Sequence, residues 1–231
     1  IEARMGRPPA DPPPLLDLRF GASDPAAGRT MTAEELRDNL LTFLVAGHET
    51  TALTLSWALY LMAFDEDVQE TARAEAQAAL GDRAAGAEDV EHLPYIRQIV
   101  LETMRLYPPV AILSRTATEP DMLRDREVKP GDVMLLPFYA LHRNECIWDE
   151  PNAFDPDRFA DPKSVDLPFG AGPRVCLGMD FGLQEAIIVL ATLLARFRFT
   201  AIPGRDPEPV MILSLRPKGG VWLDVQPVEG A

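Results

Sequence analysis

Apolar positions recur at helical spacing over four long stretches of the chain, and prolines separate these stretches from the rest. No proline occurs between Ala26 and Leu93, so long helices are possible there. The spacing predicts helices over residues 33–63, 66–80, 93–106 and 178–196. Thr32 with Glu35 predicts a capping box before the first helix, and Gly81 ends the second.

The remaining segments carry short strand and loop signals. We expect a strand over 133–137, an ordered but irregular loop over 141–173, and a C-terminal hairpin that pairs 211–215 with 221–225. The proline-rich stretch 7–25 is typical of a linker. The fold class is therefore mainly α with small β-sheets (α+β).

The first predicted helix is apolar enough over 39–63 to raise the question of a membrane span. His48 and Glu49 lie near its centre, however, and a carboxylate in the middle of a bilayer costs several kcal/mol by the more lenient scales. We expect a core helix and no membrane span.

The composition excludes some classes of function. Hydrophobic residues make up 47% of the 231 residues, which is enough for a sizeable core. The 22 basic and 36 acidic side chains give a net charge of −14, which argues against nucleic acid as a partner. Two cysteines and no visible leader at Ile1 favour a reducing compartment, and we expect a cytoplasmic location.

The segment from Phe169 to Gly178 carries the strongest chemical signal. Its glycines allow a tight loop, and Cys176 lies just before a predicted helix, whose N-terminus favours a thiolate. A thiolate held in this way is a good axial ligand for haem iron, and Arg174 could reach a carboxylate of the same cofactor. An isolated cysteine at such a place would more often be a buried structural residue.

This segment resembles the cysteine-ligand loop of the cytochrome P-450 superfamily, Phe-x-x-Gly-x-Arg-x-Cys-x-Gly. The resemblance implies haem b (iron protoporphyrin IX), with Cys176 as the metal ligand. The other positions of the loop that it places at the cofactor are Phe169, Gly170, Arg174 and Gly178.

A second family motif, 46–51, lies in the first helix. Ala46 and Thr50 share a face, and Gly47 keeps that face small. Glu49 with Thr50 puts an acid beside an alcohol, a plausible proton relay that could also loosen the helix locally. A helix-packing notch around a satisfied acid explains the same residues equally well. The resemblance implies cofactor contact by Ala46 and Gly47, and catalytic proton delivery by Glu49 and Thr50.

The third and fourth motifs are an ion-pair candidate and its partner. Glu102 and Arg105 lie three residues apart on one helix face, a pattern that is most often a solvated surface pair. The resemblance implies that Arg158 of the family's meander completes a buried Glu–Arg–Arg network, which holds the loop that carries the thiolate.

Further residues become candidates through the same resemblance. Arg115 corresponds to an arginine that binds a haem propionate, although it would otherwise be taken for a surface residue. His142, Arg143 and Trp148 are given structural roles only. Candidates for the wall of a substrate pocket, each of which taken singly is more often ordinary core, are Leu44, Val45, Val110, Ala111, Ile112, Leu213 and Ser214.

The resemblance covers only the C-terminal half of the family fold: long central helix, Glu-x-x-Arg helix, meander, cysteine-ligand loop and C-terminal hairpin. We expect 1–30 to be linker or loop and 31–231 to be the C-terminal haem-binding portion. The implied function is a haem-thiolate monooxygenase that inserts one oxygen atom from O2 into a small apolar substrate. Electrons would come from a ferredoxin, a flavodoxin or a diflavin reductase. A peroxide-driven or isomerising enzyme and a non-catalytic haem-binding fragment are the alternatives.

Overall fold

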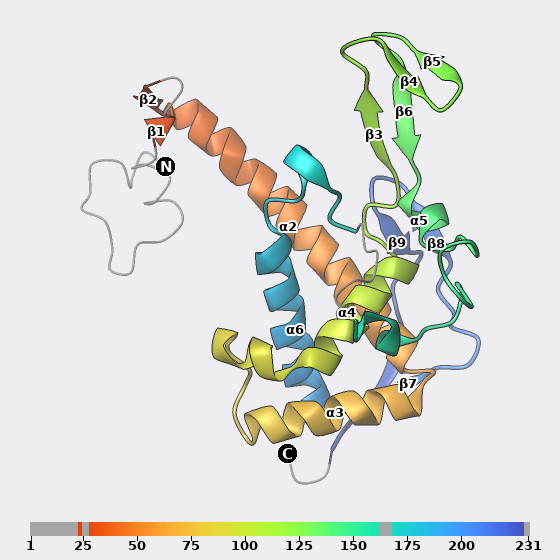
Figure 1. The fold of residues 1–231 in the computed structure, drawn as a ribbon. Helices are drawn as coiled ribbons and strands as arrows, with labels where there is room; N and C mark the ends of the chain where they lie inside the picture. Colours follow the sequence, from red (N-terminus) through yellow and green to blue (C-terminus); the bar gives the residue numbers. More distant parts are fainter. Residues whose placement is uncertain (1–22, 25–27, 162–167, 229–231) are drawn as a thin grey trace. The chain divides into compact units, whose positions relative to one another are not determined.

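A computed structural model describes residues 23–24, 28–161 and 168–228 (Figure 1). The chain divides into two compact units, Ile1–Glu49 and Thr50–Ala231, and each is described by itself. In the first unit, β1 (Ser23–Asp24) pairs antiparallel with β2 (Arg29–Thr30) inside the stretch expected to be linker. The rest of that stretch, residues 1–22 and 25–27, lies outside the described residues.

The four predicted helices are confirmed to within one residue at each end. They are α2 (Ala33–Met62), α3 (Glu66–Leu80), α4 (Pro94–Leu106) and α6 (Met179–Arg196). The capping box before α2 is also confirmed, because the Thr32 N–H donates to Glu35 Oε2 at 2.9 Å and the Glu35 N–H donates to Thr32 Oγ1 at 3.2 Å. Gly81 ends α3 at a φ of +55°.

The core of the second unit lies where α3, α4 and α6 pack together (Figure 1). Their apolar faces meet because each helix buries residues at helical spacing. The fully buried side chains Ile96, Ile99, Leu190 and Leu194 are typical of this core. Two short 3₁₀ helices join it, η1 (Ala87–His92) against α6 and η2 (Pro156–Phe159) against α4.

Two buried polar side chains on α3 tie that helix to the strand that follows α6. Gln69 donates to the carbonyls of Met62 and Phe199 and accepts the Phe199 N–H at 2.9 Å. Arg73 donates to the carbonyls of Leu194 and Phe197. Buried polar groups must be paired to be tolerated, and here they pair with backbone groups at the ends of α2 and α6 and in the strand after α6.

The strands form small antiparallel pairs, which confirms the α+β class. β3 (Leu113–Thr116) pairs with β6 (Val133–Leu136), and the β4 (Asp121–Leu123) and β5 (Arg126–Val128) hairpin extends from their far end (Figure 1). The predicted strand 133–137 is β6. A single turn of helix, α5 (Phe138–Leu141), follows it.

The predicted C-terminal hairpin is wrong, because each of its two strands pairs with a different partner. β8 (Pro209–Met211) pairs with β9 (Leu215–Pro217), and β10 (Leu223–Pro227) pairs with β7 (Phe197–Ala201) directly after α6. The prediction joined neighbouring segments through a Gly-Gly turn, whereas Val225 pairs with Phe199, so the contact is long-range. The irregular loop 141–173 contains η2, and its residues 162–167 lie outside the described part.

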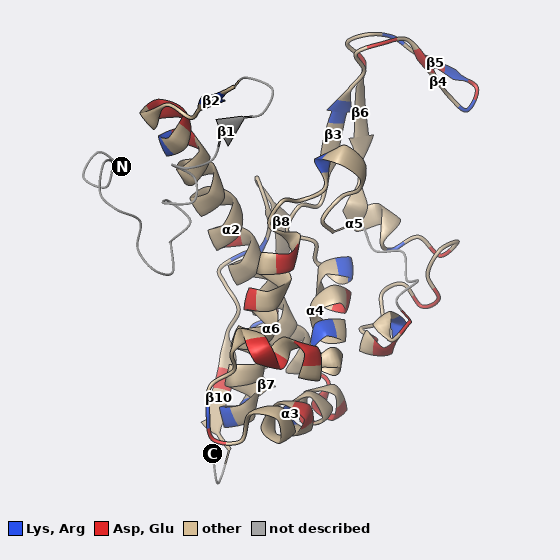
Figure 2. Cartoon of the chain, turned by 60° about the vertical axis from the view of Figure 1, so that its left-hand side comes forward, with Lys and Arg blue, Asp and Glu red and all other residues tan. Residues whose placement is uncertain are grey.

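Charge is unevenly spread over the helices of the second unit. Figure 2 shows several acidic positions on α3 and a mostly uncharged α6. This difference follows burial, because α6 lies in the core whereas α3 has one exposed face. Within the described residues we find no helix with both the length and the apolarity that crossing a bilayer requires.

Candidate functional site

The loop from Phe169 to Gly178 is held by its own backbone. The Cys176 N–H donates to the Phe169 carbonyl at 2.9 Å, and the Val175 N–H donates to Gly172 O at 3.0 Å, which closes the short helix η3 (Gly172–Arg174). Gly170 and Gly172 have φ of +74° and +72°, a conformation that residues with a Cβ rarely adopt. The glycine spacing of the motif is therefore a backbone requirement.

The loop ends at the N-terminus of α6 and presents Cys176 there. Gly178 caps α6, and the Met179 N–H donates to the Cys176 carbonyl at 3.4 Å. The Cys176 thiol is exposed, as is Arg174. The partial positive charge at a helix N-terminus favours an anion such as a thiolate.

Apolar side chains are exposed in the residues that follow this cysteine. Leu177 is 80% exposed and Phe181 is 72% exposed, whereas Phe169 is half-buried and packs on the core. Adjacent exposed apolar side chains mark a surface that another group covers.

On α4, Glu102 and Arg105 form a fully buried ion pair. Arg105 Nε donates to Glu102 Oε2 at 2.6 Å and Nη2 donates to Oε1 at 2.8 Å, with both side chains completely inaccessible. Arg158 on η2 approaches from the meander, with 3.6 Å between its Nε and Glu102 Oε1. Burial raises the pKa of the Glu102 carboxyl, and the hydrogen bonds and charge of Arg105 act against that shift.

The meander backbone completes the bonding of this ion pair. Arg105 donates to the carbonyls of His142, Pro151 and Ala153 at 2.7–2.9 Å, and Glu102 Oε1 accepts the Asp155 N–H at 2.9 Å. The sequence did not reveal these partners, because a backbone carbonyl leaves no signal in residue identity. A buried charge pair with so many hydrogen bonds fixes the path of the meander.

Aromatic side chains cover the network. The Arg105 guanidinium lies 5.0 Å from the ring centroid of Trp148. His142 is 97% buried between Phe138 and Trp148, and among the described residues neither ring nitrogen has a hydrogen-bond partner. Burial lowers its pKa from 6.5 to about 4, so the imidazole stays neutral.

The predicted pocket residues of the second unit lie on two connected segments. The Leu215 N–H donates to the Pro109 carbonyl at 2.9 Å, which brings 108–113 beside 213–215. Val110 is half-buried, Ala111 and Ser214 are buried, and Ile112 and Leu213 are exposed.

The segment 108–113 also meets the cysteine loop. A Cβ on Gly170 would lie 3.7 Å from Leu113 Cδ1, which places the loop against the start of β3. Arg115, two residues along that strand, is half-buried and donates from Nη1 to the Ser114 carbonyl at 2.9 Å.

The motif in α2 crosses the boundary between the two units. Leu44, Val45, Ala46 and Gly47 are exposed, whereas Glu49 and Thr50 are half-buried. α2 is helical throughout these residues, and the loosening expected at Thr50 does not interrupt it. The Thr50 carbonyl accepts a hydrogen bond from Thr54 Oγ1 at 3.0 Å.

Comparisons with known proteins identify the class. The family model Cytochrome P450 matches residues 7–223, and the chain belongs to this family. It is 37% identical over 211 residues to cyclooctatin synthase of Streptomyces melanosporofaciens, covering 88% of this chain and 46% of that protein. It is 39% identical over 216 residues to cytochrome P450 4F2 of Homo sapiens, covering 87% and 41%.

A solved structure agrees with this assignment. The crystal structure of a cytochrome P450 (CYP102L1) superposes with a TM-score of 0.88 at 28% identity, covering 97% of this chain and 52% of the other. The chain thus spans about half the length of the relatives it matches, and its fold is that of the C-terminal half of a cytochrome P450.

Membership in this family implies a haem cofactor, and the residues of the loop fit one. An exposed thiol at a helix N-terminus is a suitable donor for iron, and Leu177 and Phe181 offer apolar surface beside it. The exposed Arg174 and the half-buried Arg115 supply positive charge for cofactor carboxylates.

Proposed function

We propose that this chain is the haem-thiolate portion of a monooxygenase that inserts one oxygen atom from O2 into a small apolar substrate. The observation that carries the proposal is the presentation of the Cys176 thiol, exposed at the N-terminus of α6 on a loop fixed by two left-handed glycines. Bound haem b supplies the site at which dioxygen is bound and activated.

The residues of the loop bind and orient the cofactor in this proposal. Cys176 donates its sulfur to the iron, and the helix N-terminus stabilises the negative charge on that sulfur. Phe169, Gly170 and Gly178 shape the loop around it. Arg174 and Arg115 hold cofactor carboxylates as charge-assisted hydrogen-bond donors.

The residues of α2 move protons in the proposed reaction. Ala46 and Gly47 keep the helix narrow beside the cofactor. The Thr50 hydroxyl holds the proton that is delivered, and the Glu49 carboxyl replaces it from solvent. Both side chains are half-buried, which leaves them access to water. The exposed residues Leu44 and Val45, with the segments 110–112 and 213–214, supply apolar surface for the substrate.

The Glu102–Arg105–Arg158 network is proposed as the support of the loop. Its ion pairs hold the meander, which precedes the loop in the chain, so the network positions Cys176 without touching the cofactor. We further propose that a ferredoxin, a flavodoxin or a diflavin reductase supplies the electrons, and that the protein is cytoplasmic.

Isotopic labelling tests the oxygen chemistry. The intact protein is given labelled dioxygen, NADPH and a surrogate reductase, and the product is analysed by mass spectrometry. We expect one labelled oxygen atom per turnover. Product that forms only with added peroxide and carries no label from dioxygen would favour the peroxide-driven alternative.

A variant of Thr50 tests the proton relay. Thr50→Ala removes the hydroxyl, and Thr51→Ala is the control because Thr51 lies about 100° further round the helix. Peroxide release relative to product should rise in the first variant and stay unchanged in the second. An equal ratio in both variants would remove Thr50 from the relay.

A further inference from the structure

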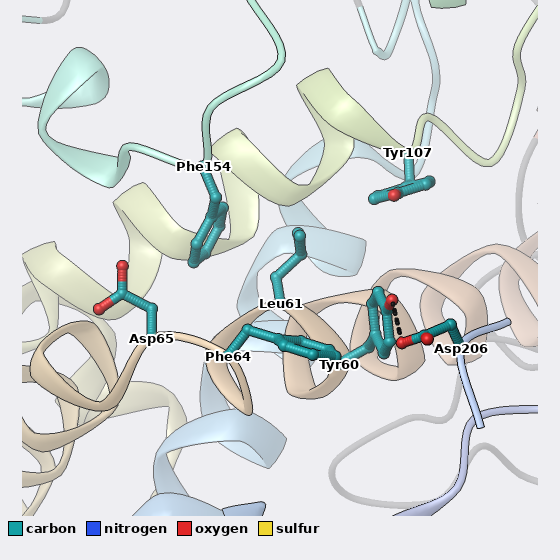
Figure 3. A pocket seen from close by; sticks show the side chains of 7 residues that line it. All are labelled: Tyr60, Leu61, Phe64, Asp65, Tyr107, Phe154 and Asp206. Carbon is teal, nitrogen blue, oxygen red and sulfur yellow. Dashed lines mark hydrogen bonds between the residues drawn. The ribbon is translucent and has the colours of Figure 1, made fainter. Parts of the chain in front are cut away.

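An open hollow of about 390 Å³ lies in the second unit where α2 ends (Figure 3). Its walls come from the last turn of α2, the residue after α4, the meander and the segment between β7 and β8. No residue proposed above for cofactor, substrate or proton transfer lines it. The lining residues are Tyr60, Leu61, Phe64, Asp65, Tyr107, Phe154 and Asp206.

Aromatic rings make up most of the wall. Tyr60 and Phe64 meet edge to face with 5.0 Å between ring centroids, and Phe64 is 60% exposed. In Figure 3 these rings and that of Phe154 are grouped around the side chain of Leu61. Aromatic faces carry partial negative charge and attract cations. Tyr107 is stacked on Trp57 at 3.9 Å, and the Arg143 guanidinium lies 5.6 Å from its ring centroid, so this ring already has partners within the chain.

The charged groups of the wall are both carboxylates. Asp206 Oδ1 accepts from the Tyr60 hydroxyl at 3.4 Å, and Asp65 Oδ1 accepts the Val68 N–H at 3.0 Å as the N-cap of α3. In the part of the chain that the structure describes, no hydrogen bond reaches Oδ2 of either carboxylate. Among the described residues no lysine or arginine forms an ion pair with either carboxylate.

The helix ends at the hollow are bonded within the chain and add no further preference for charge. The Met62 carbonyl at the end of α2 accepts from Gln69 Nε2 at 3.0 Å and from the Asp65 N–H at 3.2 Å. The N-terminus of α3 is compensated by Asp65 and by Glu66 and Asp67 in its first turn. The aromatic rings and the carboxylates are therefore the groups that favour a cation.

We propose that this hollow binds a small organic cation, whose ammonium or guanidinium group lies against the aromatic rings while the carboxylates of Asp65 and Asp206 attract it from opposite ends of the hollow (Figure 3). An inorganic cation would gain less, because the rings offer no oxygen ligands. A neutral ligand of the same shape would lose the attraction of the carboxylates.

Titration of the intact protein with matched probes tests the proposal. Choline is compared with the uncharged isostere 3,3-dimethylbutan-1-ol, and N-acetylarginine amide with N-acetylcitrulline amide, while NMR follows the ring resonances of Tyr60, Phe64 and Phe154. We expect saturable shifts with either cation and weaker binding of its neutral partner. The tighter-binding cation of the two would show whether the hollow prefers a guanidinium or an ammonium group.

Variants locate the binding in this hollow. Asp206→Asn and Asp65→Asn should each weaken binding roughly two- to fivefold, the effect of one exposed charge contact. Asparagine is also a good N-cap, so α3 should persist in the second variant. Asp224→Asn, on β10, is the control and should leave binding unchanged. Equal affinity for charged and neutral probes, or no saturable binding, would overturn the proposal.

Discussion

The Glu102 network and the cysteine loop differ most in how they meet solvent. Glu102 and Arg105 are completely buried and bonded to each other and to four backbone groups of the meander. Cys176 and Leu177 are exposed, and the loop is closed by backbone hydrogen bonds of its own. The ion pair of the first region is bonded to groups of this chain. The cysteine loop instead exposes a thiol and apolar side chains, which suits a binding surface.

Breaking the network should therefore cost the most stability. Glu102→Gln leaves Arg105 buried without a counter-charge, and we expect the free energy of unfolding to fall by about 3–5 kcal/mol. Urea unfolding followed by circular dichroism measures the change.

A matched control uses an exposed ion pair. Glu66→Gln removes one of the two carboxylate partners of Arg198, the other being Glu70, and should cost about 1 kcal/mol or less; Glu66 Oε1 lies 2.6 Å from Arg198 Nη1. Similar losses in both variants would show that the buried pair is not the stronger support.

The buried imidazole beside the network predicts a pH dependence. His142 has a pKa of about 4 in the folded chain against 6.5 when exposed, so the unfolded chain binds more protons between these values. Its contribution is fully present above about pH 6.5 and is lost as the pH falls toward about 4, by up to about 3 kcal/mol. Unfolding free energies measured across this range should show the slope.

Two histidine variants separate this effect from general acid destabilisation. His142→Phe removes the titrating group from its aromatic surroundings and should flatten the slope. His92→Gln, at an exposed position, should keep it. A slope that survives in His142→Phe would assign the dependence to other groups.

We expect the stability of the cysteine loop to depend more on backbone strain than on lost side-chain contacts. Gly170→Ala forces a Cβ into a φ of +74° and should destabilise the chain by about 1–2 kcal/mol. Gly182→Ala is the control, because Gly182 is helical in α6 with open space around it, and alanine there should stabilise by up to about 1 kcal/mol. Thermal unfolding of the two variants measures both changes in stability. Changes of the same sign would contradict this explanation.

The sequence predicted features that depend on neighbouring residues, and it did not predict contacts between residues far apart in the chain. The C-terminal end of α3 follows from Gly81, whose N–H donates to the Gln77 carbonyl of the same helix. The pairing of β10 with β7 could not be predicted in this way. The Gly-Gly turn favoured pairing of the last strand with the segment just before it, whereas its partner β7 ends at Ala201. Arg105 was placed by its spacing from Glu102, but its carbonyl partners in the meander lie 37 to 48 residues away.

The candidate site shows the same division. The positive φ of Gly170 and Gly172 and the position of Cys176 before α6 follow from the motif. The hollow beside Phe64 does not, because its walls come from four separate segments whose approach depends on tertiary packing.

The identity of the iron ligand is the most direct test of the proposed function. Reduced carbon monoxide difference spectra of the intact haem-loaded protein should show the strongly red-shifted Soret band of thiolate ligation. Cys176→His should lose that band, and Cys146→Ser, which changes the other exposed cysteine, should keep it. A red-shifted band that persists in Cys176→His, or that disappears in Cys146→Ser alone, would contradict the assignment of Cys176 as the ligand.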